Sequence, residues 1–97
     1  MIDLEPDHLV IIRAILAEYL PECEARAFGS RVRGTDHHPY SDLDLALKGK
    51  KKIDRERLSR LEEAFALSDL PIKVDVLDWW AVSSAFREEI GKRFEIV

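Results

Sequence analysis

The spacing of apolar side chains predicts three longer helices along the chain. Residues 6–20 and 53–67 repeat apolar positions every three or four residues, which is typical of amphipathic helices. Pro6 suits the first turn of the earlier helix, because its missing N–H leaves no hydrogen bond unmade there. That helix is apolar on more than one face, so we expect it to be covered on two sides or to contact another chain. A third helix is predicted over residues 80–90, ending near Gly91.

Alternation of apolar and polar residues predicts the strands that lie between these helices. The predicted strands are residues 23–28, 42–47 and 72–77, with a short edge strand at 94–97. In the clearest strand, Asp42, Asp44 and Ala46 share one face and three leucines share the other. This order of strands and helices predicts a compact domain of the α/β or α+β class.

Length, composition and charge narrow the class of protein. The chain has 97 residues, 46% of them hydrophobic and 35% charged, which is typical of one globular domain spanning residues 1–97. The net charge of −4 provides no excess of cations for binding duplex nucleic acid. No apolar run approaches the roughly 20 residues that span a membrane, and the single cysteine, Cys23, excludes an internal disulfide. We expect a cytoplasmic protein that must borrow part of any substrate site from elsewhere.

Asp42 and Asp44 are the most informative residues for chemistry. Two residues apart in a strand, they project from one face with Cα atoms about 6.7 Å apart. Carboxylates this close repel each other beside a core, and a cation between them removes the repulsion. Such hard oxygen ligands suit Mg²⁺, which also binds substrate phosphates. The alternative is an acidic strand face that is simply exposed at a sheet edge.

A glycine–serine turn before this strand predicts a phosphate site. Gly29 and Ser30 open a short helical segment that reaches Gly34. Backbone N–H groups, a hydroxyl and the positive end of a helix dipole suit an anion there. Arg31 and Arg33 lie in the first turn, where positive charge opposes the dipole, so an anionic ligand would explain both arginines. The alternative is that Ser30 is an ordinary helix N-cap.

Asp75 is a candidate for a third carboxylate of the same site. It lies on the polar face of strand 72–77, and if that strand neighbours strand 42–47, three carboxylates converge on one surface. Two metal ions roughly 3.5–4 Å apart could then activate a hydroxyl and stabilise a leaving pyrophosphate. Asp75 would complete one ion's shell or accept the proton of the nucleophile. The alternative is a half-exposed Asp75 paired with Lys73, and Asp78 is a weaker candidate at the strand end.

These motifs together resemble the minimal nucleotidyltransferase domain of the polymerase-beta-like superfamily. The likeness covers nearly the whole chain and rests on Gly29-Ser30-Arg31-Val32-Arg33-Gly34, Ser41-Asp42-Leu43-Asp44-Leu45-Ala46 and Lys73-Val74-Asp75-Val76-Leu77-Asp78. It implies the palm-like nucleotidyltransferase fold, a small mixed sheet flanked by helices. The chain is most similar to the subgroup encoded beside a helical HEPN partner. In related pairs the partner is a toxin ribonuclease, and the nucleotidyltransferase is its antitoxin, which transfers AMP from ATP to a tyrosine hydroxyl of the partner.

The resemblance also implies a role for each residue that matches its motifs. The catalytic and metal-binding residues would be Asp42, Asp44 and Asp75, and the nucleotide-binding residues would be Gly29, Ser30, Arg31 and Arg33. The expected cofactor is Mg²⁺, with two ions, and the expected substrate is ATP. The expected partner is a HEPN-type protein that supplies the acceptor hydroxyl, and the chain is expected in a homodimer or hetero-oligomer.

Two other functions fit the same sequence. The first is a binding module that neutralises its partner by occlusion, with the nucleotide site only regulatory. Helix 6–20 and the two adjacent tryptophans would then supply the contact surface. The second is transfer of a nucleotide to a small molecule, which is disfavoured because no substrate domain follows residue 97.

Three further features have ordinary structural explanations. His37 and His38 lie in a polar loop without a third metal ligand at a useful spacing, which is typical of solvated histidines. The basic run Lys50–Lys52 is typical of a loop exposed to water. Of Trp79 and Trp80, one is expected to pack under the last helix and the other to lie at an interface.

Overall fold

The computed structural model describes residues 4–33 and 42–97, and for Ser30 and Arg33 it describes the backbone alone. The helices in this part of the chain are α1 (Pro6–Tyr19), α2 (Ser30–Arg33), α3 (Arg55–Ala66) and α4 (Ser84–Lys92). The strands are β1 (Glu24–Phe28), β2 (Leu43–Lys48), β3 (Val74–Asp78) and β4 (Glu95–Ile96). The predicted loop that contains His37 and His38 lies outside the described residues.

The strands form one mixed sheet in the order β3-β2-β1-β4. β1 pairs antiparallel with β2 and with β4, whereas β2 and β3 run parallel. A parallel pair needs a crossover connection, and α3 supplies it because it lies between β2 and β3 in the chain. The predicted mixed sheet flanked by helices is confirmed. The second and third strands are neighbours, which is the condition that convergence of the carboxylates required.

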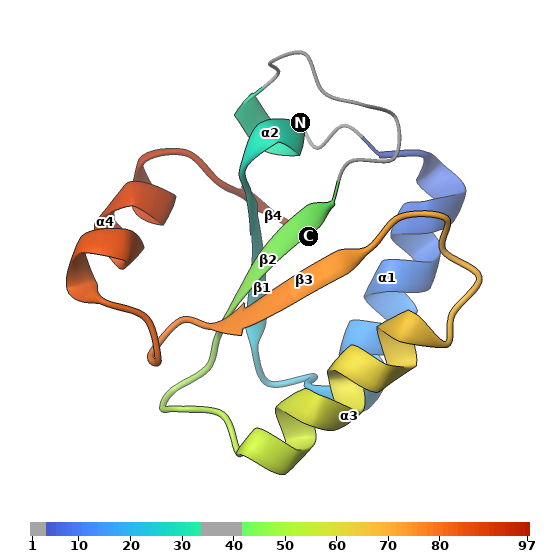
Figure 1. Cartoon of the computed structure of the whole chain (residues 1–97), viewed down its shortest axis with the longest axis horizontal. Coiled ribbons are helices and arrows are strands. Elements are labelled where there is room, and N and C mark those ends of the chain that lie inside the picture. Colours follow the sequence, from blue (N-terminus) through green and yellow to red (C-terminus); the bar gives the residue numbers. More distant parts are fainter. Residues whose placement is uncertain (1–3, 34–41) are drawn as a thin grey trace.

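The two faces of the sheet carry separate apolar clusters. α1 and α3 cover one face, and α4 lies on the other (Figure 1). The larger cluster, under α1 and α3, includes the three leucines that alternate along β2, each 0% exposed: Leu43, Leu45 and Leu47. The smaller cluster holds Ala46, Trp79 and Ile90 on the α4 side. The face opposite the leucines is therefore the one that carries Asp44.

The last helix is displaced from its predicted position over residues 80–90. α4 begins at Ser84, because Ser83 caps it by accepting a hydrogen bond from the Phe86 N–H at 3.1 Å. The helix also continues through Gly91, which was expected to end it. Among the described residues a positive φ occurs at Gly29 alone, so Gly91 has no left-handed backbone that would stop the helix. The remaining elements begin and end within two residues of their predicted positions.

The turn that precedes α4 is held by Asp78, which is only 6% exposed. Its carboxylate accepts hydrogen bonds from the backbone N–H groups of Ile53 at 2.8 Å and Trp80 at 3.0 Å. Trp79 packs in the smaller cluster under α4, as predicted. Trp80 is half-buried, and its indole N–H donates to the Gly49 carbonyl at 2.8 Å, while the interface contact expected of the second tryptophan stays a prediction. Asp78 and Trp80 therefore have structural roles.

α1 is covered on one side only. Ile12 is its single buried residue, and Val10 on the outer side is 65% exposed. The inner side packs against α3 and the larger cluster, through Ile15, Leu16 and Tyr19. Val10 is thus an exposed large apolar side chain on the outer surface of this helix. In residues 4–33 and 42–97, no helix has both the length and the apolar character needed to cross a membrane.

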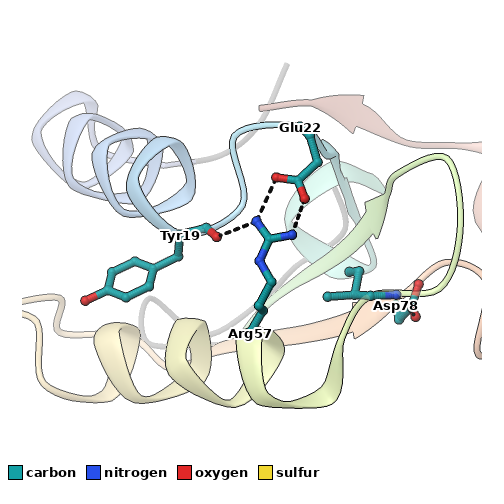
Figure 2. A network of polar contacts seen from close by, with 5 residues as sticks. Tyr19, Glu22, Arg57 and Asp78 are labelled. Carbon is teal, nitrogen blue, oxygen red and sulfur yellow. Dashed lines mark hydrogen bonds and ion pairs between the residues drawn. The ribbon is translucent and has the colours of Figure 1, made fainter.

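An ion pair connects the turn after α1 to α3 (Figure 2). The Arg57 guanidinium donates hydrogen bonds to both carboxylate oxygens of Glu22, and a further one to the Tyr19 carbonyl at 3.2 Å. These bonds favour the charged carboxylate and lower the pKa of Glu22 from 4.5 to about 2. The pair is exposed to solvent, so salt screens its contribution to stability.

Replacing Glu22 with Gln is expected to lower the melting temperature slightly at neutral pH. Because the folded pKa of Glu22 is depressed, its contribution is complete above pH 4.5 and is lost as the pH falls through about 2. The difference in melting temperature between the wild type and Glu22→Gln should therefore shrink over this range, as followed by circular dichroism. Arg57→Gln should behave alike, and the double variant should add nothing further. A difference that stays constant across this pH range would contradict the assignment.

Candidate active site

Asp44 occupies the centre of the candidate site. In the parallel ladder it pairs with Asp75 of β3, and in the antiparallel ladder it pairs with Phe28 of β1. Residues that are directly paired across two strands project from the same face of a sheet. The structure therefore brings Asp44 and Asp75 side by side on the face opposite the buried leucines.

Gly29 directly follows β1 and lies against Asp44. Its φ of +88° falls in the left-handed region that favours glycine. A Cβ atom at this position would lie 2.8 Å from Asp44 Oδ2, which is closer than atoms pack in proteins. α2 starts at the next residue, and the Val32 N–H donates to the Gly29 carbonyl at 3.1 Å. Both the backbone conformation and the close approach to the carboxylate thus require glycine here.

Burial and neighbouring charge disfavour the ionised form of Asp44. The pKa of Asp44 is raised mainly by burial, then by the charges of Asp75 and Asp42. Asp42 is exposed and lies just before β2. Lys73 compensates part of the negative charge, since its Nζ lies 3.3 Å from Asp75 Oδ1. Asp75 therefore forms the ion pair with Lys73 that was the alternative explanation of this residue. It also lies beside Asp44, as a residue of the candidate site would.

The chemistry of these carboxylates fits Mg²⁺. Carboxylate oxygens are hard ligands, and a divalent cation beside Asp44 would relieve its repulsion from Asp42 and Asp75. Within the described residues, no three His, Cys, Asp or Glu side chains already form a group that could hold a metal ion. Mg²⁺ characteristically takes few protein carboxylates and completes its shell with water and substrate phosphates. The side chains that would hold it are those of Asp42 and Asp44, with Asp75 next to them.

The structure describes some of the residues predicted to bind the nucleotide in full and others by their backbone alone. Gly29 lies against Asp44, and Ser30 begins α2 directly after it. The side chains of Ser30 and Arg33 lie outside what the structure describes. Arg31 is buried, with 6% of its surface exposed, so it belongs to the interior of the turn. The predicted phosphate turn and the predicted carboxylates therefore meet at Gly29 and Asp44.

A pocket beside Gly29 was not predicted from the sequence. It has a volume of about 450 Å³ and is lined by Phe28, Gly29, Phe86, Glu89, Ile90, Lys92 and Arg93. It lies where the end of β1 faces α4, on the carboxylate side of the sheet. Phe28 and Phe86 resemble ordinary core positions of a strand and a helix, and no local pattern relates two segments so far apart in the chain. The pocket is therefore a product of tertiary packing.

Comparisons with known proteins show the family of this chain. Residues 12–97 match the family described as "Polymerase beta, Nucleotidyltransferase". A relative from Haemophilus influenzae, named "Probable protein adenylyltransferase MntA", is 43% identical over 96 residues, which cover 99% of this chain and 83% of the relative. The match to this relative extends through the strands that carry the candidate carboxylates.

Solved structures of toxin–antitoxin proteins share the fold of this chain. A toxin–antitoxin structure with AMP-PNP superimposes with a TM-score of 0.73 at 25% identity, covering 90% of this chain and 69% of that one. Two variants of the MntA–HpeT toxin–antitoxin complex each give a TM-score of 0.72, at 21% and 22% identity, and show the same fold. They cover 96% and 97% of this chain and 72% of each of theirs. The chain therefore belongs to the polymerase beta nucleotidyltransferase family and is an enzyme of its minimal, MntA-like type.

Proposed function

We propose that the chain is an antitoxin that transfers AMP from ATP to a hydroxyl group of its toxin partner. The observation that carries this proposal is the position of Asp44 between Asp75 on one side and Gly29 on the other. An in-line displacement needs the attacking hydroxyl and the leaving pyrophosphate on opposite sides of the α-phosphorus. With the α-phosphorus over Asp44, the hydroxyl would approach beside Asp75 and the pyrophosphate would leave beside Gly29.

The proposed reaction exchanges one P–O bond for another. The acceptor oxygen forms a bond to the α-phosphorus, and the bond from that phosphorus to the bridging oxygen of pyrophosphate breaks. Asp42 and Asp44 would hold Mg²⁺, which when bound neutralises phosphate charge and favours the deprotonated acceptor. Backbone N–H groups at Gly29 and Ser30 would bind the departing phosphates, with Arg33 assisting, whereas Arg31 is too buried to contact them directly. Asp75 would either complete the metal shell or accept the proton of the hydroxyl.

The proposed partner is a HEPN-type toxin, and the proposed acceptor is one of its tyrosine hydroxyls. The 43% identical relative is named as a probable protein adenylyltransferase, and the three structural neighbours are toxin–antitoxin structures. One of those neighbours holds AMP-PNP, an analogue of ATP, which supports ATP as the substrate. The proposed site of action is the cytoplasm, where ATP is available.

The test is labelling of the purified partner with ATP that carries radioactive phosphorus at the α-position. Label should appear on the partner, and an equal amount of pyrophosphate should be released. ATP labelled at the γ-position is the control and should transfer nothing, because adenylylation and phosphorylation carry different phosphorus atoms. Transfer from the γ-position, or no transfer from the α-position, would refute the proposed activity.

A binding role without catalysis is the second candidate, and the exposed side chain of Val10 on α1 supports it. Val10 is 65% exposed, so the outer side of this helix could contact a partner directly. The two functions differ in what the double variant Asp42→Asn/Asp44→Asn does in cells that express the toxin. Neutralisation by occlusion predicts that this variant still protects the cells, whereas neutralisation by AMP transfer predicts that protection is lost.

A further inference from the structure

β3 lies at an edge of the sheet and has one open side. In the strand order β3-β2-β1-β4, its one partner among the described strands is β2. Just before β3, the Lys73 carbonyl accepts a hydrogen bond from the Leu43 N–H of β2 at 2.9 Å. The backbone groups of successive residues point to opposite sides of a strand, so every second residue from Lys73 onward faces β2. The N–H and C=O groups of Val74 and Val76 therefore point to the open side.

A groove follows this open edge. It has a volume of about 490 Å³ and lies between β3 and the second half of α3, which packs beside the strand (Figure 1). Phe65, Leu70 and Val76 give it apolar walls, and the consecutive residues 73–76 supply its strand side. Free backbone groups beside apolar side chains are the two features with which a sheet edge binds an extended peptide.

Asp75 belongs both to this edge and to the candidate active site. It is paired with Asp44, so the two carboxylates share one face of the sheet. On a strand added to β3, the residue opposite Asp75 would project from that same face. The two residues beside it would project from the other face, where Phe65 and Val76 line the groove. An added strand would therefore direct one side chain to the carboxylates and its two neighbours into the groove.

The position of an added strand also selects the length of the acceptor side chain. Neighbouring strands lie about 4.8 Å apart, so the added backbone would lie roughly 10 Å from that of β2. The proposed α-phosphorus lies over Asp44 of β2, on the far side of β3. A serine hydroxyl is one bond from Cβ and stays over its own strand, whereas a tyrosine hydroxyl lies at the far end of a ring. Tyrosine is therefore the acceptor that this geometry favours.

We propose that an extended segment of the toxin partner adds to the open edge of β3, with its acceptor tyrosine opposite Asp75 and apolar residues on either side. The inference rests on the proposed function, because it takes the hydroxyl to attack beside Asp75. The backbone groups of Val74 and Val76 hold the segment, and the groove selects the residues that flank the tyrosine. A helix is a poorer occupant, since its backbone N–H and C=O groups are already bonded within the helix.

The first test removes one backbone donor from the edge. Val74→Pro lacks the N–H on the open side, and the first residue of an edge strand tolerates proline. AMP transfer by the whole chain is measured over a range of partner concentrations. KM for the partner should rise about five- to tenfold, as for one lost hydrogen bond, with kcat and the dissociation constant of ATP close to the wild type. Val74→Ala loses the same side chain but keeps the N–H, so its KM should rise less.

The second test fills the groove. Ala66 is an exposed lining residue at the end of α3, so Ala66→Arg places a large side chain in the groove without entering the core. KM for the partner should rise about tenfold or more, and ATP binding should not change. Ser59→Arg is the matched control, because Ser59 is exposed on the same helix and does not line the groove. It should leave both quantities unchanged.

Amide hydrogen exchange gives a readout that needs no variant. In the chain alone, the N–H groups of Asp75 and Leu77 face β2, whereas those of Val74 and Val76 face the open side. Binding of the partner without ATP should slow exchange at Val74 and Val76 far more than at Asp75 and Leu77. This alternating pattern is specific to an added strand, because a partner that only covers the edge has no reason to select every second residue.

Failure of this inference can be distinguished from failure of the proposed function. If the wild type labels the partner, but both variants keep its KM or the alternating protection is absent, strand addition is wrong and the proposed function is untouched. If Ala66→Arg alone raises KM, or Val74→Pro lowers kcat alone, the partner adds no strand and the inference fails. If Val74→Pro does not fold, Ala66→Arg and the exchange pattern decide. If the wild type transfers no AMP, the proposed function fails together with the inference.

Discussion

Replacing Asp44 with Asn is expected to reduce AMP transfer about a thousandfold and, at the same time, to make the fold slightly more stable. The loss follows because a neutral amide is a weak metal ligand and supplies no charge to balance a divalent cation beside the reacting phosphate. The gain follows because burial and the charges of Asp75 and Asp42 all disfavour the Asp44 carboxylate. We expect the melting temperature to rise by about 1–3 °C, a small change because the half-buried carboxylate is still partly solvated.

The initial rate of AMP incorporation into the partner and the thermal melt of the purified variant measure these two effects. Asp78→Asn is the matched control, because Asp78 is an acidic residue of the neighbouring strand that holds two backbone N–H groups. This variant should melt at a lower temperature, since an amide nitrogen cannot accept one of those bonds, and should keep most of its transfer rate while folded. An Asp44→Asn variant that melts below the wild type, or transfers AMP at the wild-type rate, would contradict the assignment.

Replacing Gly29 with Ala is expected to damage stability and activity together. A φ of +88° is costly for any residue with a Cβ, and that atom would overlap Asp44 Oδ2 at 2.8 Å. The two effects together should lower the free energy of unfolding by about 2–3 kcal/mol. The transfer rate should fall about a hundredfold or more, because either Asp44 or the phosphate turn must move away from its position.

Gly91→Ala provides the control for this prediction. Gly91 lies inside α4, and a Cβ atom there would meet nothing within 4 Å. Because alanine favours a helix over glycine, this variant should be more stable by about 0.5–1 kcal/mol. Thermal or denaturant unfolding measures both glycine variants. A Gly29→Ala protein as stable as the wild type would show that the turn accommodates a side chain, and an unchanged transfer rate would show that the close approach to Asp44 has no functional meaning.

Local patterns predicted most of the elements because each element buries one face. The alternating leucines of β2 are fully buried, and the helical period of α3 places Leu61 and Phe65 on its buried side. The predicted start of the last helix, at residue 80, was wrong, because the start of α4 depends on hydrogen bonds rather than on the spacing of apolar residues. Ser83 caps this helix, and Asp78 holds the preceding turn by bonding to Ile53, which is distant in the chain. No repeating pattern of apolar residues encodes such contacts.

The amino-acid order alone determined which side chains are available for chemistry: Asp42 and Asp44 on the polar face of one strand, Asp75 on that of another, and a glycine before a short helix. Only the tertiary structure decided their neighbours. Asp44 lies between Asp75 and Gly29 because a parallel crossover through α3 and an antiparallel pairing with β1 set the order of the strands. The same packing lets the Asp78 carboxylate accept a hydrogen bond from the Ile53 N–H and places the rings of Phe28 and Phe86 in contact. Such contacts join distant segments, and their energies depend on the shape of the whole core, which local periodicity does not contain.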